Sequence, residues 1–201
     1  MATATIAIPP AEMPLPHEFR GRVGMWCLIA AESAIFSIFV VAYLYYAGKS
    51  LNGPTPREVL HVPVFNSICL FSSSFTIVMA ERAIARGKSR LFGIWWFLTI
   101  ALGTIFILGT AREWYHLIHT DGLTISSSLF GTTFYSLVGL HAFHVMVGLT
   151  GLSIIMIFTA LGLVKQEHAP RIEVFAMYWH FVDAVWVVVL TVVYVLPLWV
   201  D

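Results

Sequence analysis

Long apolar stretches separated by short polar segments dominate the sequence. Five of the stretches are long enough to cross a bilayer, which takes about 20 residues in a helix. They cover residues 23–47, 64–85, 91–117, 128–164 and 174–199. Each is predicted to be helical, because a segment exposed to lipid must satisfy its own backbone hydrogen bonds. The pattern therefore predicts an all-α, polytopic membrane bundle of five transmembrane helices.

The hydrophobic pattern divides the chain into two parts. Residues 1–21 are polar and rich in proline, and they form a predicted cytoplasmic N-terminal segment, whereas residues 22–201 form the five-helix transmembrane domain. The first part lacks a basic region followed by a short apolar core and a small-residue cleavage site, so no cleaved signal peptide is expected.

Composition supports a bilayer as the solvent of this chain. Hydrophobic residues make up 59% and charged residues 11% of it, whereas soluble domains carry about 25% charged residues. Lys+Arg and Asp+Glu are equal at 11 each, so net charge gives no reason to expect a nucleic-acid partner. The polar connections are too short for a catalytic domain, and any catalysis is expected to belong to a larger assembly.

The basic residues are distributed unevenly between the two predicted sides of the membrane. The side with the N-terminus carries Arg20, Arg22, Arg82, Arg86, Lys88, Arg90, Lys165 and Arg171, and the other side carries Lys49, Arg57 and Arg112. Short loops rich in Lys and Arg stay in the cytoplasm. The N-terminus is therefore predicted to be cytoplasmic and the C-terminus to lie outside.

Two acids, Glu32 and Asp183, fall near the middle of predicted spans. Each lies about ten residues into its helix, or ~15 Å deep. A charged side chain there costs about 2.5–3.5 kcal/mol on insertion scales, so each acid needs a reason to be present. Proton exchange and hydrogen bonding between helices explain Glu32 equally well. By contrast, Arg112 and Glu113 lie near a helix end and are predicted to form a surface ion pair.

Histidines accompany these acids at helical spacing. His180 precedes Asp183 by three residues, and His141 precedes His144 by three, so each pair shares a helix face. His180 and Asp183 are expected to bond each other or a common partner. Ligation of a metal is disfavoured, because no His-Glu-x-x-His run accompanies them, and a packing role is favoured for both pairs.

Small polar residues and cysteines in the apolar runs are predicted to serve packing. Asn66 and the hydroxyl residues of the second span, with the glycines of the third and fourth, let helices approach closely. Cys27 and Cys69 have no metal-ligand spacing and are expected to be small buried hydrophobes.

Several motifs in order resemble one family. Residues 22–36 read RVGMWCLIAAESAIF, residues 62–67 read VPVFNS, residues 72–76 read SSSFT, residues 139–145 read GLHAFHV, and residues 178–186 read YWHFVDAVW. This series resembles subunit III of cytochrome c oxidase and the wider haem-copper oxidase family. The resemblance covers nearly the whole chain after residue 20.

The resemblance implies an accessory role without a redox centre on this chain. Such a subunit packs with subunits I and II of a proton-pumping terminal oxidase in the bacterial inner membrane, and haem and copper belong to those partners. It binds phospholipid and supports the stability and proton uptake of subunit I. Electrons would pass from cytochrome c to oxygen, and membership of a respiratory supercomplex stays open.

The resemblance also assigns roles to residues. Glu32 corresponds to the buried, carbodiimide-reactive glutamate of the family, with Asp183 and His180 as its expected network, and His141 and His144 correspond to its paired histidines. Arg22, Asn66, Trp179 and Trp186 are candidates for lipid contact or packing. Compared with seven-helix members, this chain lacks the first two helices and hence one wall of the lipid cleft.

Three alternatives stay open at this point. The chain resembles subunit III of quinol oxidases and the related protein associated with nitric oxide reductases almost equally well. A free-standing proton or ion transporter is a more distant alternative, disfavoured because the sequence shows no internal repeat or broken helix.

Overall fold

A computed structural model describes residues 17–49 and 59–198 of the chain. Its elements are α1 (His17–Tyr46), α3 (Val64–Ala85), α4 (Ser89–His119), α5 (Leu129–Ala160), the 3-10 turn η1 (Gln166–His168), α6 (Ala169–Val189), the π-helical η2 (Leu190–Val195) and the 3-10 turn η3 (Leu196–Leu198). These described residues contain no strand. The predicted all-α fold is confirmed.

Five spans of the described residues are long and apolar enough to cross a membrane, as predicted. They cover Arg20–Tyr46, Val64–Ala85, Ser89–His119, Leu129–Ala160 and Gln166–Val195. The second span agrees with its prediction residue for residue. The first helix begins earlier than predicted, inside the polar N-terminal segment. Residues 1–16, Arg57 and Trp199, on which parts of the predictions rest, lie outside the described residues.

Two helices end at left-handed glycines. After α3, Gly87 has a φ of 70°, and the N–H of Lys88 donates to the carbonyl of Ala83 at 3.0 Å. After α5, Gly162 has a φ of 71°, and the N–H of Leu163 donates to the carbonyl of Phe158 at 2.9 Å. Glycine is suited to this conformation because it has no Cβ to clash. The fourth span therefore stops short of the predicted residue 164.

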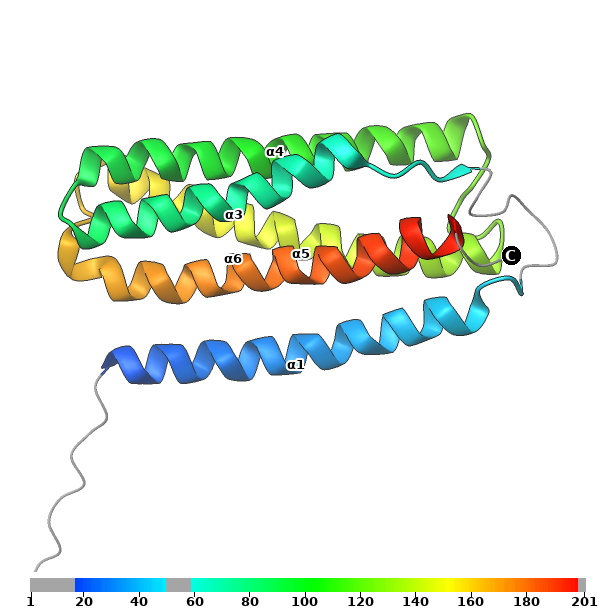
Figure 1. Cartoon of the computed structure of the whole chain (residues 1–201), viewed down its shortest axis with the longest axis horizontal. Helices are drawn as coiled ribbons and strands as arrows, with labels where there is room; N and C mark the ends of the chain where they lie inside the picture. Colours follow the sequence, from blue (N-terminus) through cyan, green and yellow to red (C-terminus); the bar gives the residue numbers. More distant parts are fainter. Residues whose placement is uncertain (1–16, 50–58, 199–201) are drawn as a thin grey trace, which may run out of the picture.

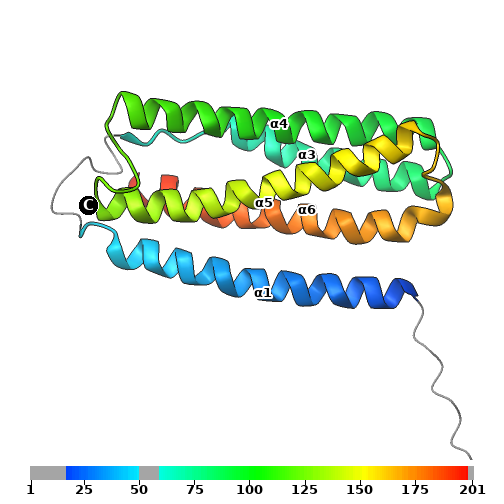
Figure 2. The ribbon, with the colours of Figure 1, turned by 180° about the vertical axis from the view of Figure 1, so that it is seen from behind.

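The helices run side by side in one elongated bundle (Figures 1 and 2). Helices α3 and α4 pack closely together, and α1 lies at the edge, mainly against α5 and α6. The start of α1 and the end of α6 lie at opposite ends of the bundle, as an odd number of spans requires. We call these ends the N-terminal end and the C-terminal end; which one faces the cytoplasm stays a prediction.

A buried tryptophan at the centre joins four helices. Trp179 of α6 packs so tightly that a Cβ at Gly103 of α4 would lie 2.9 Å from its ring, and one at Gly148 of α5 only 2.8 Å. Its indole N–H donates to Ser73 Oγ of α3 at 2.9 Å. The predicted close approach of helices at glycine and hydroxyl residues is confirmed here.

The outer surface of the bundle is apolar. Exposed large side chains include Trp26, Ile38, Phe65 and Leu108, each more than 60% exposed, as expected for helices in lipid or against other membrane proteins. Cys69 is buried as predicted, but the same prediction is wrong for Cys27, which is exposed. The reason is that α1 lies at the edge and buries only a narrow face.

Gly148→Ala is expected to destabilise the bundle by about 1–3 kcal/mol, because its methyl group would overlap the Trp179 ring. Gly24→Ala is the matched control, since a Cβ at Gly24 meets nothing within 4 Å. Thermal unfolding of the purified protein in detergent measures both variants. Equal midpoints for the two would show that close packing of Trp179 does not limit stability.

Candidate functional site

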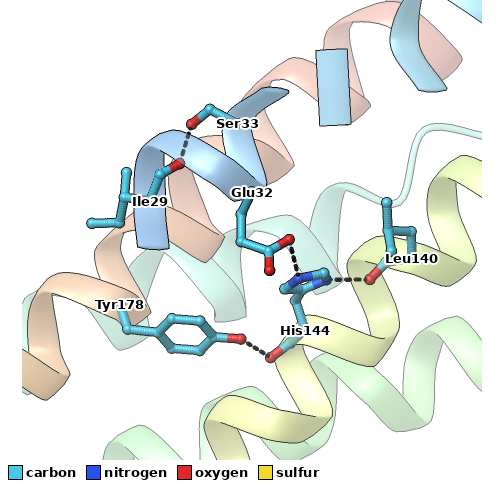
Figure 3. A network of polar contacts seen from close by, with 6 residues as sticks. All are labelled: Ile29, Glu32, Ser33, Leu140, His144 and Tyr178. Carbon is cyan, nitrogen blue, oxygen red and sulfur yellow. Dashed lines mark hydrogen bonds and ion pairs between the residues drawn. The ribbon is translucent and has the colours of Figure 1, made fainter. Parts of the chain in front are cut away.

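An acid and a histidine from different helices meet in the middle of the bundle. Glu32 Oε2 of α1 lies 3.1 Å from His144 Nε2 of α5, and the two side chains are 22% and 9% exposed (Figure 3). On its other side, His144 Nδ1 lies 2.7 Å from the carbonyl oxygen of Leu140. We call Glu32 and His144 the acid–histidine pair.

The hydrogen-bonding geometry requires a proton between Glu32 and His144. A carbonyl oxygen can only accept, so His144 Nδ1 must carry a hydrogen and donate it to Leu140. The contact between Nε2 and the Glu32 carboxyl then needs one more proton, held either by the acid or by the imidazole. The acid–histidine pair therefore joins α1 to α5 through a hydrogen bond between two ionisable side chains.

The surroundings of the acid–histidine pair fix the imidazole in place. The ring centroid of Phe36 lies 5.0 Å from that of His144, and the ring of Phe143 contacts it edge-on at 5.7 Å. The Tyr178 hydroxyl of α6 donates to the backbone carbonyl of His144 at 3.1 Å (Figure 3). Three helices, α1, α5 and α6, thus converge on this histidine.

A second polar group forms where α3 meets α6. Ser74 Oγ donates to Asp183 Oδ2 and lies 3.1 Å from His180 Nδ1. Since the single hydroxyl hydrogen goes to the carboxylate, the serine oxygen accepts from His180. The prediction that His180 and Asp183 share a partner is confirmed. We call these three residues the Ser74 cluster.

The structure separates the two acids that their similar depth suggested as partners. Glu32 bonds His144 on α5, whereas Asp183 and His180 bond Ser74 on α3. The expected network of Glu32 with His180 and Asp183 is thus replaced by two separate groups. The physical reason is that α1 and α3 lie on different sides of α6, so one face of α6 cannot serve both.

The paired histidines of α5 take different roles. His141 is only 1% exposed and stacks on Trp186, with ring centroids 5.0 Å apart. Neither of its ring nitrogens has a hydrogen-bond partner in the part of the chain that the structure describes. The packing role favoured for both histidines fits His141, whereas His144 belongs to the acid–histidine pair.

The remaining candidates make contacts that hold helices together. Arg22 forms an ion pair with Glu173 of α6 at 2.5 Å, and a pair this exposed contributes about 0–1 kcal/mol. Asn66 packs against Gly109 of α4, where any Cβ would collide with its amide. Trp186 donates to Ser67 Oγ at 3.1 Å. Lipid contact by these residues stays a prediction.

The described residues form no cluster of metal-ligating side chains around these groups. Within residues 17–49 and 59–198, no three His, Cys, Asp or Glu side chains lie together in a way that could hold an ion. A groove of about 430 Å³ lies between α1 and α6, lined mostly by apolar side chains such as Val40, Phe181 and Val188, and also by Ser33 and Ser37. Its lining suits an apolar chain better than a polar ligand.

The sequence did not single out two residues that take part in these contacts, Ser74 and Tyr178. Ser74 is one of three consecutive serines, and only the packing of α3 against α6 distinguishes it from Ser72. Tyr178 stands in an aromatic run, and its bond to the carbonyl of His144 depends on the register between α5 and α6. Helical periodicity on α3 could have restricted the choice to one face of the helix, but not to one serine.

Five apolar helices long enough to span a membrane, with ionisable side chains that bond across helices, define a polytopic membrane protein. The family model described as "Cytochrome c oxidase subunit III" matches residues 20–199. The chain belongs to the cytochrome c oxidase subunit III family.

Curated relatives agree with this membership. Cytochrome c oxidase subunit 3 of Alkalihalophilus pseudofirmus is 32% identical over 176 residues, covering 87% of this chain and 85% of the relative. The protein of the same name from Synechocystis is 37% identical, covering 86% of this chain and 74% of the relative. Quinol oxidase subunit 3 of Bacillus subtilis is 29% identical, covering 88% of this chain and 87% of the relative.

Ser74→Ala is expected to destabilise the protein by about 1–3 kcal/mol, because it removes the donor to a buried carboxyl group. Ser72→Ala, on the exposed face of the same turn, is the control and is expected to be neutral. Thermal unfolding in detergent measures the difference. If Ser74→Ala and Ser72→Ala unfold at the same temperature, the bond from Ser74 to Asp183 contributes nothing to folding.

Proposed function

We propose that this chain is a non-redox accessory subunit of a haem-copper terminal oxidase in a bacterial inner membrane. Subunits I and II would be its partners and would carry the haem and copper. Family membership supports this assembly, and the apolar outer surface of the bundle suits contact with other membrane proteins. The observation that supports the functional part is the acid–histidine pair, in which Glu32 Oε2 lies 3.1 Å from His144 Nε2.

Cytochrome c is the proposed electron donor of the complex. Relatives at 32% and 37% identity are named cytochrome c oxidase subunit 3, which favours this donor. A quinol oxidase is the second candidate, because relatives from Bacillus subtilis and Staphylococcus saprophyticus are named as quinol oxidase subunits. The homologue associated with nitric oxide reductases and a free-standing transporter have no observation in their favour.

The acid–histidine pair would support proton uptake by the neighbouring catalytic subunit. In this proposal Glu32 and His144 share one proton. The Glu32 side chain is 22% exposed on the edge helix α1, whereas His144 of α5 is buried. A proton can therefore enter the pair from one direction and leave it in another when a partner covers that face. Asp183 and His180 of the Ser74 cluster would mainly hold α6 against α3, and His141 would pack the core.

Phospholipid is the proposed ligand of the groove between α1 and α6. The groove is about 430 Å³, mostly apolar, and bordered by two serines, which suits an acyl chain. The proposed orientation places the arginine-rich N-terminal end in the cytoplasm, because basic residues gather there. Residues 1–21 would then be the cytoplasmic segment, and residues 22–201 the transmembrane domain.

Gentle purification of the tagged chain from its membrane is expected to bring a haem-containing complex with it. The measurement is the reduced-minus-oxidised absorbance spectrum of the purified fraction, with native mass spectrometry of its subunits. An unrelated tagged membrane protein of the same cells is the control. A chain that is recovered alone, without haem, would contradict the accessory role and favour a free-standing transporter.

Glu32→Gln is expected to slow proton uptake by the intact complex and to hasten its inactivation during turnover. Glutamine preserves the shape of the side chain but cannot hold an exchangeable proton with His144. The control is Glu173→Gln, which removes the same charge from an exposed ion pair on α6. Proton uptake and oxygen consumption are measured together. Unchanged rates in Glu32→Gln, with normal assembly, would exclude a proton role for this residue.

A further inference from the structure

One basic residue at the C-terminal end of the bundle lacks the partner that the sequence predicts for it. Arg112 of α4 is expected to pair with Glu113 at the surface, but no ion pair or hydrogen bond with another described residue involves its guanidinium group. The prediction of a surface ion pair is therefore wrong. By comparison, Lys49 at the same end lies over the Tyr45 ring, with Nζ 3.5 Å from the ring centroid. Arg112 is thus an exposed cation without a counter-ion in the described part of this chain.

Arg112 lines a cavity of about 580 Å³, which we call the α3–α4 cavity. Its walls come from the segment before α3, the first turn of α3 and the C-terminal half of α4, which lie together at the C-terminal end of the bundle (Figure 1). Its polar lining residues are His61, Asn66, Arg112, Glu113 and His116. It shares no lining residue with the groove between α1 and α6, so the two spaces are separate.

Two further side chains of the α3–α4 cavity have hydrogen bonds to offer. The Asn66 amide packs against α4, where a Cβ at Gly109 would lie 2.2 Å from its Nδ2 atom, so its position is restricted. Neither this amide nor the His61 imidazole has a hydrogen-bond partner among the described residues. His116 differs, because its Nδ1 atom lies 3.3 Å from Asp121 Oδ2. With Arg112, three side chains that can donate hydrogen bonds thus line one cavity without a partner.

The backbone at the start of α3 adds positive character to the α3–α4 cavity. Pro63 precedes the helix and provides no side-chain cap, and the first turn contains no acidic residue. The free N–H groups and the positive end of the helix dipole are therefore left for another acceptor. Pro63, Phe65 and Asn66 all belong to the lining of the cavity. The helix start and the unpartnered side chains thus favour the same kind of ligand, an anion that accepts several hydrogen bonds.

Glu113 is the one acid in the printed lining of the α3–α4 cavity, and a carboxylate there would repel an anion. Its carboxyl group, however, accepts a hydrogen bond from the Tyr194 hydroxyl of η2. Tyr194 is only 3% exposed, and Glu113 Oε1 is itself buried. The carboxyl group is therefore directed toward the interior of the bundle, whereas Arg112, the next residue on α4, is exposed.

The α4 wall of the cavity changes from apolar to cationic toward the end of the bundle. Ile105, Leu108, Arg112 and His116 follow one another at intervals of three or four residues, so they share one face of α4. Leu108 is 64% exposed and Ile105 is 39% exposed. Arg112 lies one turn, or about 5–6 Å, beyond Leu108. A ligand with an anionic head and apolar chains matches this order, whereas a soluble anion would leave the apolar part of the face uncovered.

We propose that the α3–α4 cavity binds the phosphate group of a membrane phospholipid, with the Arg112 guanidinium and the Asn66 amide as donors and the acyl chains along Ile105 and Leu108. A guanidinium group forms paired, charge-assisted hydrogen bonds with phosphate oxygens. Basic pockets between transmembrane helices bind the head groups of anionic lipids. This site is additional to the phospholipid proposed for the groove between α1 and α6 and does not depend on it.

Native mass spectrometry of the intact complex, depleted of lipid and titrated with phosphatidylglycerol, tests this site. Arg112→Gln is expected to remove one tightly bound phosphatidylglycerol and to weaken its binding by about tenfold or more, because a charge-assisted hydrogen bond is lost. Asn66→Asp should weaken it too, since a carboxylate of nearly the same shape replaces a donor. Lys49→Gln is the matched control, because it removes a positive charge at the same end but outside the cavity. Equal lipid binding by Arg112→Gln and Lys49→Gln would overturn the proposal.

Two further probes in the same titration separate the phosphate group from the rest of the lipid. Diacylglycerol, which has the acyl chains without the phosphate, is expected to leave the site empty, and binding as tight as that of phosphatidylglycerol would rule out phosphate recognition. Inorganic phosphate in excess is expected not to displace the bound lipid. Displacement would instead assign the cavity to a soluble anion.

An electron cryo-microscopy map of the wild-type complex provides a test that no folding defect of a variant can obscure. Density for a lipid phosphate beside Arg112 and Asn66 is expected, and a carboxylate of a neighbouring subunit in that place would exclude the lipid. Neither experiment measures electron transfer or proton uptake, so a negative result here leaves the proposed accessory role unaffected.

Discussion

A polar side chain buried in a bilayer has to be satisfied by another helix, because hydrocarbon offers it no partner. This constraint explains the bonds that cross the bundle. Ser74 of α3 holds Asp183 and His180 of α6, and His144 of α5 holds Glu32 of α1. Each bond fixes which faces of two helices meet. The ionisable groups therefore define the arrangement of the helices as well as any chemistry between them.

Close packing is the second requirement, and glycine and tryptophan meet it together. Inside a bilayer the hydrophobic effect does not drive helices together, because lipid tails are as apolar as the side chains. Van der Waals contact between closely fitting surfaces therefore decides which helix faces associate. Trp179 fills the space that Gly103 and Gly148 leave, and its N–H is satisfied by Ser73. One large side chain thereby contacts three neighbours of α6, namely α3, α4 and α5.

The edge position of α1 connects the fold to the proposed function. It is held mainly by α5 and α6, and its polar links are the ion pair of Arg22 with Glu173 and the contact of Glu32 with His144. The Glu32 side chain is 22% exposed on this edge helix, whereas the Ser74 cluster lies between α3 and α6.

The sequence by itself determined the number of spans, the all-α fold and the presence of ionisable residues at mid-depth, because hydropathy and helical spacing act locally along the chain. It also indicated the family through motifs in order. Only the tertiary structure decided that Glu32 pairs with His144 and not with Asp183, and that one serine of three bonds the acid. Those outcomes depend on the rotation and register of one helix against another, which local periodicity leaves free.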